Sequence, residues 1–398
     1  MKTQTFMTTR MRTVIASVAV VGGVVIGAML MARPPRVAVV GDLPNALADT
    51  TFWKMFESMS EDGGFFRSDN FVSNESALQY VIPTVLDRVG QGSVYVGVGP
   101  EQNFTYLAAF RPRLAFIVDI RRQNALAHLM YKALFELSSD RADFLARLFA
   151  RARPRGLDTN SSVAQLMDEF TEVALDTLLF RRSFEDIAKH LRAQPGYSLS
   201  VEDLESIEYV LGAFVHGGPQ LTYSSGRGAG VRRGSNFSGY GSGMFGMPTF
   251  AWLMTEDDGE GVERGFLATE ANFRFVQDMQ RRNAIVPVVG DFAGSKALHS
   301  VGDYVRSHGA TIGVFYTSNV EQYLFQSGDA WSRFYENVSK LPVTDRSMFI
   351  RSVTSRFARR SQHPNARMTQ LTVPMAELIR AFREDEVRSY YDVIDMSR

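Results

Sequence analysis

The chain has 398 residues, with 43 basic and 43 acidic side chains and a hydrophobic fraction of 45%. This composition is typical of a globular protein with a substantial core, and the balanced charge gives no general attraction for nucleic acid. The complete absence of cysteine excludes disulfides, thiolate nucleophiles and cysteine-bound metal ions. The six histidines are scattered without the close spacing of metal ligands, so we expect no metal site.

The N-terminal segment carries the one targeting signal. Lys2, Arg10 and Arg12 precede an uncharged apolar run over residues 14–32. This run is at the lower edge of what spans a bilayer and is longer than a usual signal-peptide core. Residues 1–48 are therefore interpreted as a cleaved signal peptide or an uncleaved anchor with a linker. The basic flank favours an exported body, periplasmic or extracellular, or one tethered to the inner membrane through this segment alone.

Residues 49–121 are expected to hold an amphipathic helix and the first βαβ unit. The helix lies near residues 52–59, and a turn leads from it into an extended stretch at residues 63–70. The unit comprises a strand at residues 93–98, the turn Gly97-Val98-Gly99-Pro100, a helix at residues 101–110 and a strand at residues 114–118 ending at Asp119. Strand, glycine turn, helix, strand and acid in that order begin a parallel sheet.

Residues 122–262 are predicted to form a large helical insertion after the second strand. Apolar residues three and four apart indicate helices at residues 124–137, 140–151, 162–180 and 201–214. Residues 216–247 are rich in glycine and serine, which cannot bury enough apolar surface to order a chain. We interpret them as a flexible loop, with a functional lid or a phosphate cradle as the alternatives.

Residues 263–398 return to alternating strands and helices. We expect helices at residues 270–282, 296–307, 330–340 and 372–382, and strands at residues 284–289, 311–315 and 348–353. The alternation predicts an α/β fold, a Rossmann-like doubly wound parallel sheet with helices on both faces.

Polar residues follow four of the predicted strands, where an open parallel sheet binds its ligands. They are Gly97, Gly99, Pro100 and Glu101 after the first strand, Asp119 after the second, Asp291 and Phe292 after the third, and Tyr316 to Asn319 after the fourth. Structural explanations remain open beside the functional one. The glycines could simply make a tight turn, Asp119 could pair with Arg121 or Arg122, and Asp291 could cap the next helix. Tyr316 and Asn319 could be ordinary turn residues.

In the order of these strand ends, the chain resembles class I S-adenosylmethionine-dependent methyltransferases. The resemblance implies that Gly97, Gly99 and Pro100 lie beneath the methionine part of that cofactor and that Asp119 binds the ribose. It also implies that Asp291 and Phe292 contact the adenine. Tyr316 and Asn319 would then face the methyl acceptor, and Tyr316 or Glu321 would accept a proton.

Two departures from that family's pattern affect the turn, and a third affects the end of the fourth strand. Tyr95 stands where an acid usually precedes the first glycine, Glu101 replaces the third glycine, and the fourth strand lacks the Asn/Asp-Pro-Pro signature of amino-methyltransferases. Glu101 would face a helix N-terminus and could bind an ammonium group in place of the missing acid.

A closer resemblance, to an uncharacterised bacterial family with a methyltransferase-like fold, rests on three stretches. They are residues 66–75, 97–104 and 318–324. It implies a fold without an established activity. Two functions are therefore expected as alternatives. The first is a methyltransferase-like protein that binds a nucleoside-containing small molecule, such as S-adenosylmethionine, and is an enzyme for an unknown acceptor. The second is a non-enzymatic extracytoplasmic binding or scaffold protein on a degenerate form of the fold. An exported body favours the second, because S-adenosylmethionine is a cytoplasmic metabolite.

Overall fold

The computed structural model describes residues 41–223, 247–354 and 368–398. The chain divides into two units, residues 1–36 and residues 37–398, and every described residue belongs to the second. The apolar run at residues 14–32 and most of the glycine- and serine-rich segment therefore lie outside the described residues. Within the described ranges no helix combines the length and the apolar character needed to cross a membrane.

Six strands of the described chain form one sheet. They are β1 (Val94–Gly97), β2 (Leu114–Asp119), β3 (Ile285–Val289), β4 (Ile312–Ser318), β5 (Met348–Thr354) and β6 (Met368–Pro374). Their order across the sheet is β3-β2-β1-β4-β5-β6, and all neighbours are parallel except β5 and β6. Almost every strand residue is buried, as expected for a parallel sheet covered on both faces. The predicted α/β, Rossmann-like doubly wound fold is confirmed.

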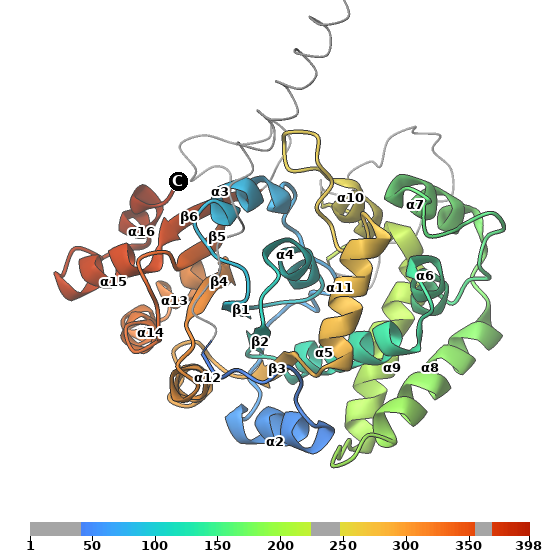
Figure 1. Cartoon of the computed structure of the whole chain (residues 1–398), viewed down its shortest axis with the longest axis horizontal. Coiled ribbons are helices and arrows are strands. Elements are labelled where there is room, and N and C mark those ends of the chain that lie inside the picture. The colour runs from blue at the N-terminus through green and yellow to red at the C-terminus, as the bar shows by residue number, and fades with distance from the viewer. Residues whose placement is uncertain (1–40, 224–246, 355–367) are drawn as a thin grey trace, which may run out of the picture. The chain divides into compact units, whose positions relative to one another are not determined.

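The helices form two layers and an outer group. In chain order they are α2 (Asp49–Met59), α3 (Ile82–Leu86), α4 (Gln102–Phe110), α5 (Arg122–Leu137), α6 (Arg141–Phe149), α7 (Val163–Glu172), α8 (Thr177–Arg192), α9 (Val201–Gly217), α10 (Phe250–Thr255), α11 (Glu270–Arg281), α12 (Ala297–Ser307), α13 (Val320–Leu324), α14 (Ala330–Val338), α15 (Met375–Arg383) and α16 (Tyr390–Met396). Helices α4, α11 and α5 pack side by side, and α12 packs against both α2 and α14. Helices α6 to α9 gather outside α5, in green in Figure 1, so the helical insertion lies beyond one face of the sheet.

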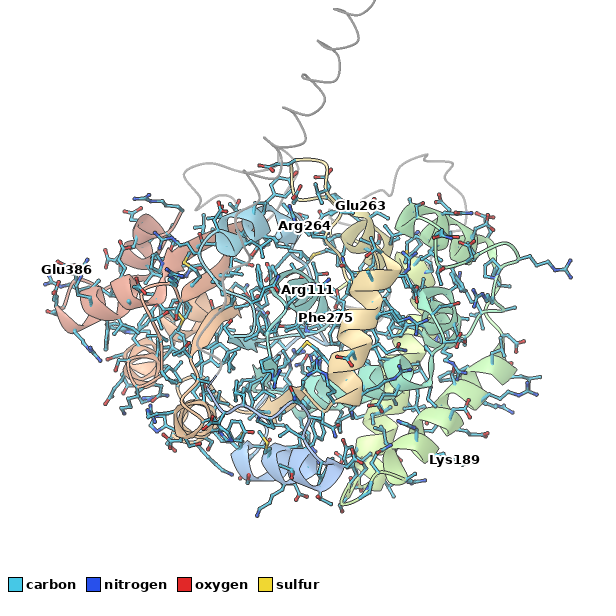
Figure 2. The ribbon with its side chains drawn as sticks, viewed as in Figure 1. Arg111, Lys189, Glu263, Arg264, Phe275 and Glu386 are labelled. Atoms are coloured by element: carbon cyan, nitrogen blue, oxygen red, sulfur yellow. The ribbon has the colours of Figure 1, made fainter. Side chains whose placement is uncertain are left out.

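The layer formed by α4 and α11 is fastened where α4 ends. Arg111 follows the last turn of α4 in a left-handed conformation with φ of 49°, and its guanidinium lies 4.6 Å from the ring centre of Phe275 on α11. Figure 2 shows these two side chains next to each other. A cation–π contact of this kind contributes about 0.5–2 kcal/mol.

Two predicted helices differ from the structure. The helix predicted at residues 162–180 is two helices, because the chain extends at Val173 and Asp176 caps α8 by accepting from the amides of Leu178 and Leu179. The helix predicted at residues 372–382 begins only at Met375. The residues before it form β6, because β5 offers them a complete antiparallel ladder that local periodicity does not show.

Gly290, directly after β3, is expected to be intolerant of a side chain. A Cβ atom there would lie 2.2 Å from the Cβ of Ala297, at the start of α12. We expect Gly290→Ala to lower the free energy of unfolding by about 1–3 kcal/mol, measured by urea denaturation, because α12 would have to shift. The control is Gly212→Ala in α9, where the nearest atom would be 3.8 Å away. It should be neutral or stabilise by about 0.5–1 kcal/mol. Equal effects of the two variants would contradict the explanation.

Candidate functional site

The topological switch point of the sheet lies between β1 and β4. Strand β1 has β2 on one side and β4 on the other, so the chain reverses its direction of growth across the sheet there. Open α/β sheets bind ligands beyond the carboxyl ends of the strands at this point. The loop after β1 and the end of β4 are therefore the first places to seek a site.

The turn after β1 is buried and filled by the protein itself. Every residue from Gly97 to Glu101 is buried, and Gly99 has φ of +81°, which favours glycine. The side-chain Nδ2 of Asn103 donates to the carbonyls of Val98, Gly99 and Pro100 at 2.8–3.0 Å. A Cβ on Gly97 would lie 2.1 Å from the amide oxygen of Asn103. The close approach that Gly97 permits is thus used by the side chain of Asn103.

An irregular segment, residues 60–77, lies across the carboxyl edge of the sheet, and we call it the cover segment. Its contacts follow the strand order β3, β2, β1, β4. The amide of Glu61 donates to Val289 at the end of β3, and the amide of Gly64 donates to Ile120 just after β2. The amide of Ser73 donates to Glu101 after β1, at 3.1 Å. The predicted extended stretch at residues 63–70 is part of this segment.

Glu75 of the cover segment lies at the centre of a buried polar network at the switch point. Tyr316, at the end of β4, donates to its carboxyl group at 2.6 Å, Ser318 also donates to it, and Gln370 of β6 does so at 3.3 Å. Burial raises the pKa of Glu75 above its ordinary value, although these hydrogen bonds oppose the shift. No ion pair among the described residues includes Glu75.

Glu101 is a second buried acid at the same place. Its pKa is raised to about 8. Burial is the largest cause, the hydrogen bond from the amide of Ser73 opposes the shift, and the nearby Glu75 carboxyl adds to it. One of its carboxyl oxygens accepts from Ser73, and the other has no hydrogen-bond partner among the described residues. Its neighbour Gln102 donates to the Tyr316 hydroxyl at 3.1 Å, which joins the turn after β1 to the end of β4.

Three buried side-chain atoms without a hydrogen-bond partner border this turn in the described structure. They are Oε2 of Glu101, Oε1 of Gln102 and Nδ1 of His128 on α5. The Nε2 atom of His128 lies 2.9 Å from the carbonyl of Gly99, so Nε2 carries the proton and Nδ1 is left as an acceptor. Burial lowers the pKa of His128 to about 4, which keeps the ring neutral. Buried acceptors without donors indicate a place that a donor-bearing ligand or water would satisfy.

Asp119, at the end of β2, is held by Arg121. The Nε atom of Arg121 donates to one carboxylate oxygen at 3.0 Å and an Nη atom donates to the other at 2.8 Å. The side chains of this pair are only 7% and 6% exposed. The other Nη atom of Arg121 donates to the carbonyls of Ser68 and Asp69 in the cover segment. The structural alternative for Asp119, pairing with Arg121, is therefore present in the molecule.

The residues after β3 have separate surroundings. Asp291 is half-buried, and its carboxylate accepts from the amide of Ala293 in the turn before α12. Phe292 is 3% exposed, and its ring packs against Phe315 at 5.2 Å and Phe334 at 5.6 Å between ring centres. Its ring therefore belongs to the core.

Glu321, on α13, forms an ion pair that lies apart from the Glu75 network. Arg351 of β5 donates to both carboxylate oxygens, at 2.6 and 3.1 Å, and the hydroxyl of Tyr335 donates to one at 2.6 Å. Glu321 and Arg351 are both essentially unexposed. Asn319 is half-buried at the start of α13 and contacts the hydroxyl of Ser318 at 3.4 Å. Of the residues predicted at the end of β4 and in α13, Tyr316 and Ser318 join the network around Glu75, and Glu321 does not.

The structure thus brings Glu101 and Tyr316 together with three residues that the sequence did not single out: Glu75, Gln102 and Gln370. Gln102 directly follows a predicted site residue and could have been chosen for that reason. Glu75 lies in one of the stretches that carried the closer family resemblance, but nothing local marks it as buried. Gln370 lies on β6, a strand that the sequence did not predict.

The described residues show no cluster of metal ligands, and two hollows lie elsewhere on the surface. In residues 41–223, 247–354 and 368–398 no group of three or more histidine, aspartate or glutamate side chains could hold a metal ion. Two surface hollows of about 230 and 310 Å³ lie on α12, α14 and α15, and their lining includes no cover-segment or predicted site residue.

Comparison with known proteins identifies one family. The family model described as "Domain of unknown function (DUF7790)" matches residues 70–198 and 252–389, more than half of the chain. The matched ranges include β1 to β6, Glu75, Glu101 and Asp119. No curated protein matches the chain.

The raised pKa of Glu101 predicts a loss of stability at higher pH. The folded state keeps a proton on Glu101 up to about pH 8, whereas an unfolded glutamate releases it near the ordinary value of 4.5. The stabilisation is complete below that value and is lost as pH rises toward 8. Burial also raises the pKa of Glu256 to about 8, so the two acids act in the same direction. We expect the free energy of unfolding to fall from pH 5 to pH 8, by up to about 1.4 kcal/mol per pH unit for each proton.

Urea denaturation at pH 5, 6.5 and 8 measures this slope. Glu101→Gln should make the slope shallower by the contribution of one proton, because glutamine does not titrate. The variant should still fold, because its side-chain oxygen can accept from the amide of Ser73. Glu208→Gln on the exposed face of α9 should keep the wild-type slope. An unchanged slope in Glu101→Gln would show that this acid does not hold a proton in the folded state.

Proposed function

We propose that this chain, which belongs to the DUF7790 family, binds a positively charged, nucleoside-containing small molecule at the β1–β4 switch point. S-adenosylmethionine is the leading candidate. One observation carries the proposal. Glu75 and Glu101 are buried together at the switch point, and neither takes part in an ion pair among the described residues.

The cost of burying acids explains why this observation points to a ligand. A carboxylate taken out of water is strongly disfavoured unless a cation or several hydrogen bonds compensate it. Nearby, Asp119 and Glu321 each have an arginine. Glu75 and Glu101 have none within the described ranges, and Oε2 of Glu101 has no hydrogen-bond partner there. A ligand that brings a positive charge and N–H donors would supply what these groups lack.

The resemblance to methyltransferases suggests how such a ligand would lie. The methionine part would occupy the region of Gly97, Gly99 and Pro100, with its ammonium group at Glu101 in place of the missing acid. The ribose would meet Asp119, and the adenine would lie near Asp291 and Phe292. Since the Phe292 ring is part of the core, Asp291 is the more accessible contact of the two.

If the bound molecule is a methyl donor, the chain would act mainly by holding donor and acceptor in line. The acceptor would then need to lose a proton. Of the two residues predicted for this role, Tyr316 has the better position, because its hydroxyl donates to Glu75 and would pass its own proton to that carboxylate as it takes the proton of the acceptor. Glu321 already has both oxygens bound by Arg351.

Calorimetric titration with S-adenosylmethionine, S-adenosylhomocysteine and adenosine tests the proposal. We expect all three to bind, and Glu101→Gln to weaken the first two about tenfold or more, because a charge-assisted hydrogen bond is lost. Adenosine lacks the ammonium group, so its affinity should not change. Glu208→Gln serves as the matched exposed control. Folded protein that gives no heat with any of the three ligands would overturn the proposal.

A second candidate, a non-enzymatic extracytoplasmic binding or scaffold protein, is favoured by a different observation. The glycine turn is wholly buried, and Asp119 is already satisfied by Arg121, so the fold could have kept its architecture without the ancestral ligand. The location of the body separates the candidates. We propose, from the basic flank and the apolar run at residues 14–32, that it is exported or tethered to the inner membrane.

A reporter fused to the C-terminus and active only outside the cytoplasm tests this location. We expect the full chain to give activity and a fusion lacking residues 1–36 to give none, because the apolar run would direct export. Activity of a reporter that works only in the cytoplasm would place the body with the S-adenosylmethionine pool and weaken the scaffold candidate.

A further inference from the structure

Arg121 holds the cover segment and the predicted ribose acid at the same time. Its guanidinium forms a two-point ion pair with Asp119, and its remaining Nη atom donates to Ser68 at 3.3 Å and to Asp69 at 2.7 Å. The guanidinium also lies 5.8 Å from the ring centre of Phe66. A single side chain thus connects the end of β2 to residues 66–69 of the cover segment.

The two roles of Arg121 depend on each other. A buried guanidinium is tolerated because Asp119 neutralises it, and removing one partner of a buried pair leaves an uncompensated charge. If another donor took the carboxylate of Asp119, Arg121 would be driven toward solvent. The carbonyls of Ser68 and Asp69 would then lose their side-chain donor.

The surrounding segment has the features of a part that can move. Gly63 and Gly64 are exposed, and Phe65 is 88% exposed, so little apolar burial holds this end of the segment. Its attachments here include the amide of Gly64 to Ile120, the contacts of Arg121, an edge contact of the Phe66 ring with Tyr323, and a hydrogen bond from Tyr209 to Asp69. Beyond Asn70 the chain is buried again from Phe71 onward.

We infer that Arg121 is a latch on the cover segment, and that a ligand bearing a vicinal pair of hydroxyl groups opens it by competing for Asp119. The choice of ligand rests on the proposed function, whereas the latch rests only on the contacts of Arg121. Two hydroxyl donors can satisfy the two oxygens that Arg121 now occupies. Binding at Asp119 and release of residues 63–70 are then one coupled equilibrium.

Amide hydrogen exchange without ligand tests the latch. The amides of Gly64, Phe71 and Ser73 are the reporters, because each donates within or beside the cover segment. Arg121→Gln should raise their exchange about tenfold or more relative to the amide of Ala115 in β2. Since this variant leaves Asp119 unpaired, the double variant Asp119→Asn/Arg121→Gln is measured beside it and should show the same local rise.

Arg113→Gln is the matched control. Arg113 also fastens irregular chain through backbone carbonyls, those of Leu43 and Pro44. Its loss should raise exchange near Asp42 and Leu47 and leave the three reporters unchanged. Reporters that stay protected in both Arg121 variants would overturn the latch, whether or not any ligand binds.

Calorimetry with adenosine and 2′,3′-dideoxyadenosine tests the competition. Removing a competing group raises the fraction of binding-competent protein, so Arg121→Gln should bind adenosine about tenfold more tightly than wild type. The dideoxy compound, which lacks the hydroxyl pair, should gain much less. An equal gain for both would overturn the competition at Asp119. Failure of both compounds to bind either protein would count against the proposed function, and the exchange data would still decide the latch.

Discussion

Backbone groups at the carboxyl edge of a parallel sheet must find partners once that edge is covered, and this requirement organises the molecule. The cover segment meets it at one strand end after another, with Glu61 at β3, Gly64 after β2 and Ser73 after β1. An irregular segment can therefore be buried without forming a strand or a helix. The closed glycine turn and the buried acids both follow from having protein, and not solvent, over the edge.

The acids at this edge fall into two classes that differ in what fixes their charge. Asp119 and Glu321 are each held by an arginine in a buried pair, in which the guanidinium balances the carboxylate charge. Glu75 and Glu101 depend on hydrogen bonds from hydroxyls, amides and a side-chain amide, and burial raises the pKa of both. The first class maintains the architecture. The second can respond to protons or to a cation, which is why the proposed ligand is placed there.

The part of the candidate site that the sequence predicted consists of residues at the ends of correctly predicted strands. Gly97, Asp119 and Tyr316 lie on neighbouring strands because parallel strands bring their carboxyl ends to one edge. Glu75 escaped prediction because the contact that defines it joins residues 241 positions apart. The same limit explains β6, whose ladder with β5 overrides the weak local preference that predicted a helix from residue 372.

The sequence by itself determined the alternation of strands and helices, the break after β1 and the acid after β2, because hydrophobic period and turn chemistry are local properties. It also left pairing with Arg121 as an open alternative for Asp119. Only the tertiary structure decided which groups that acid meets, and that one arginine ties it to Ser68 and Asp69 more than fifty residues earlier. Burial and long-range partners set the charge of a side chain, and no local pattern records them.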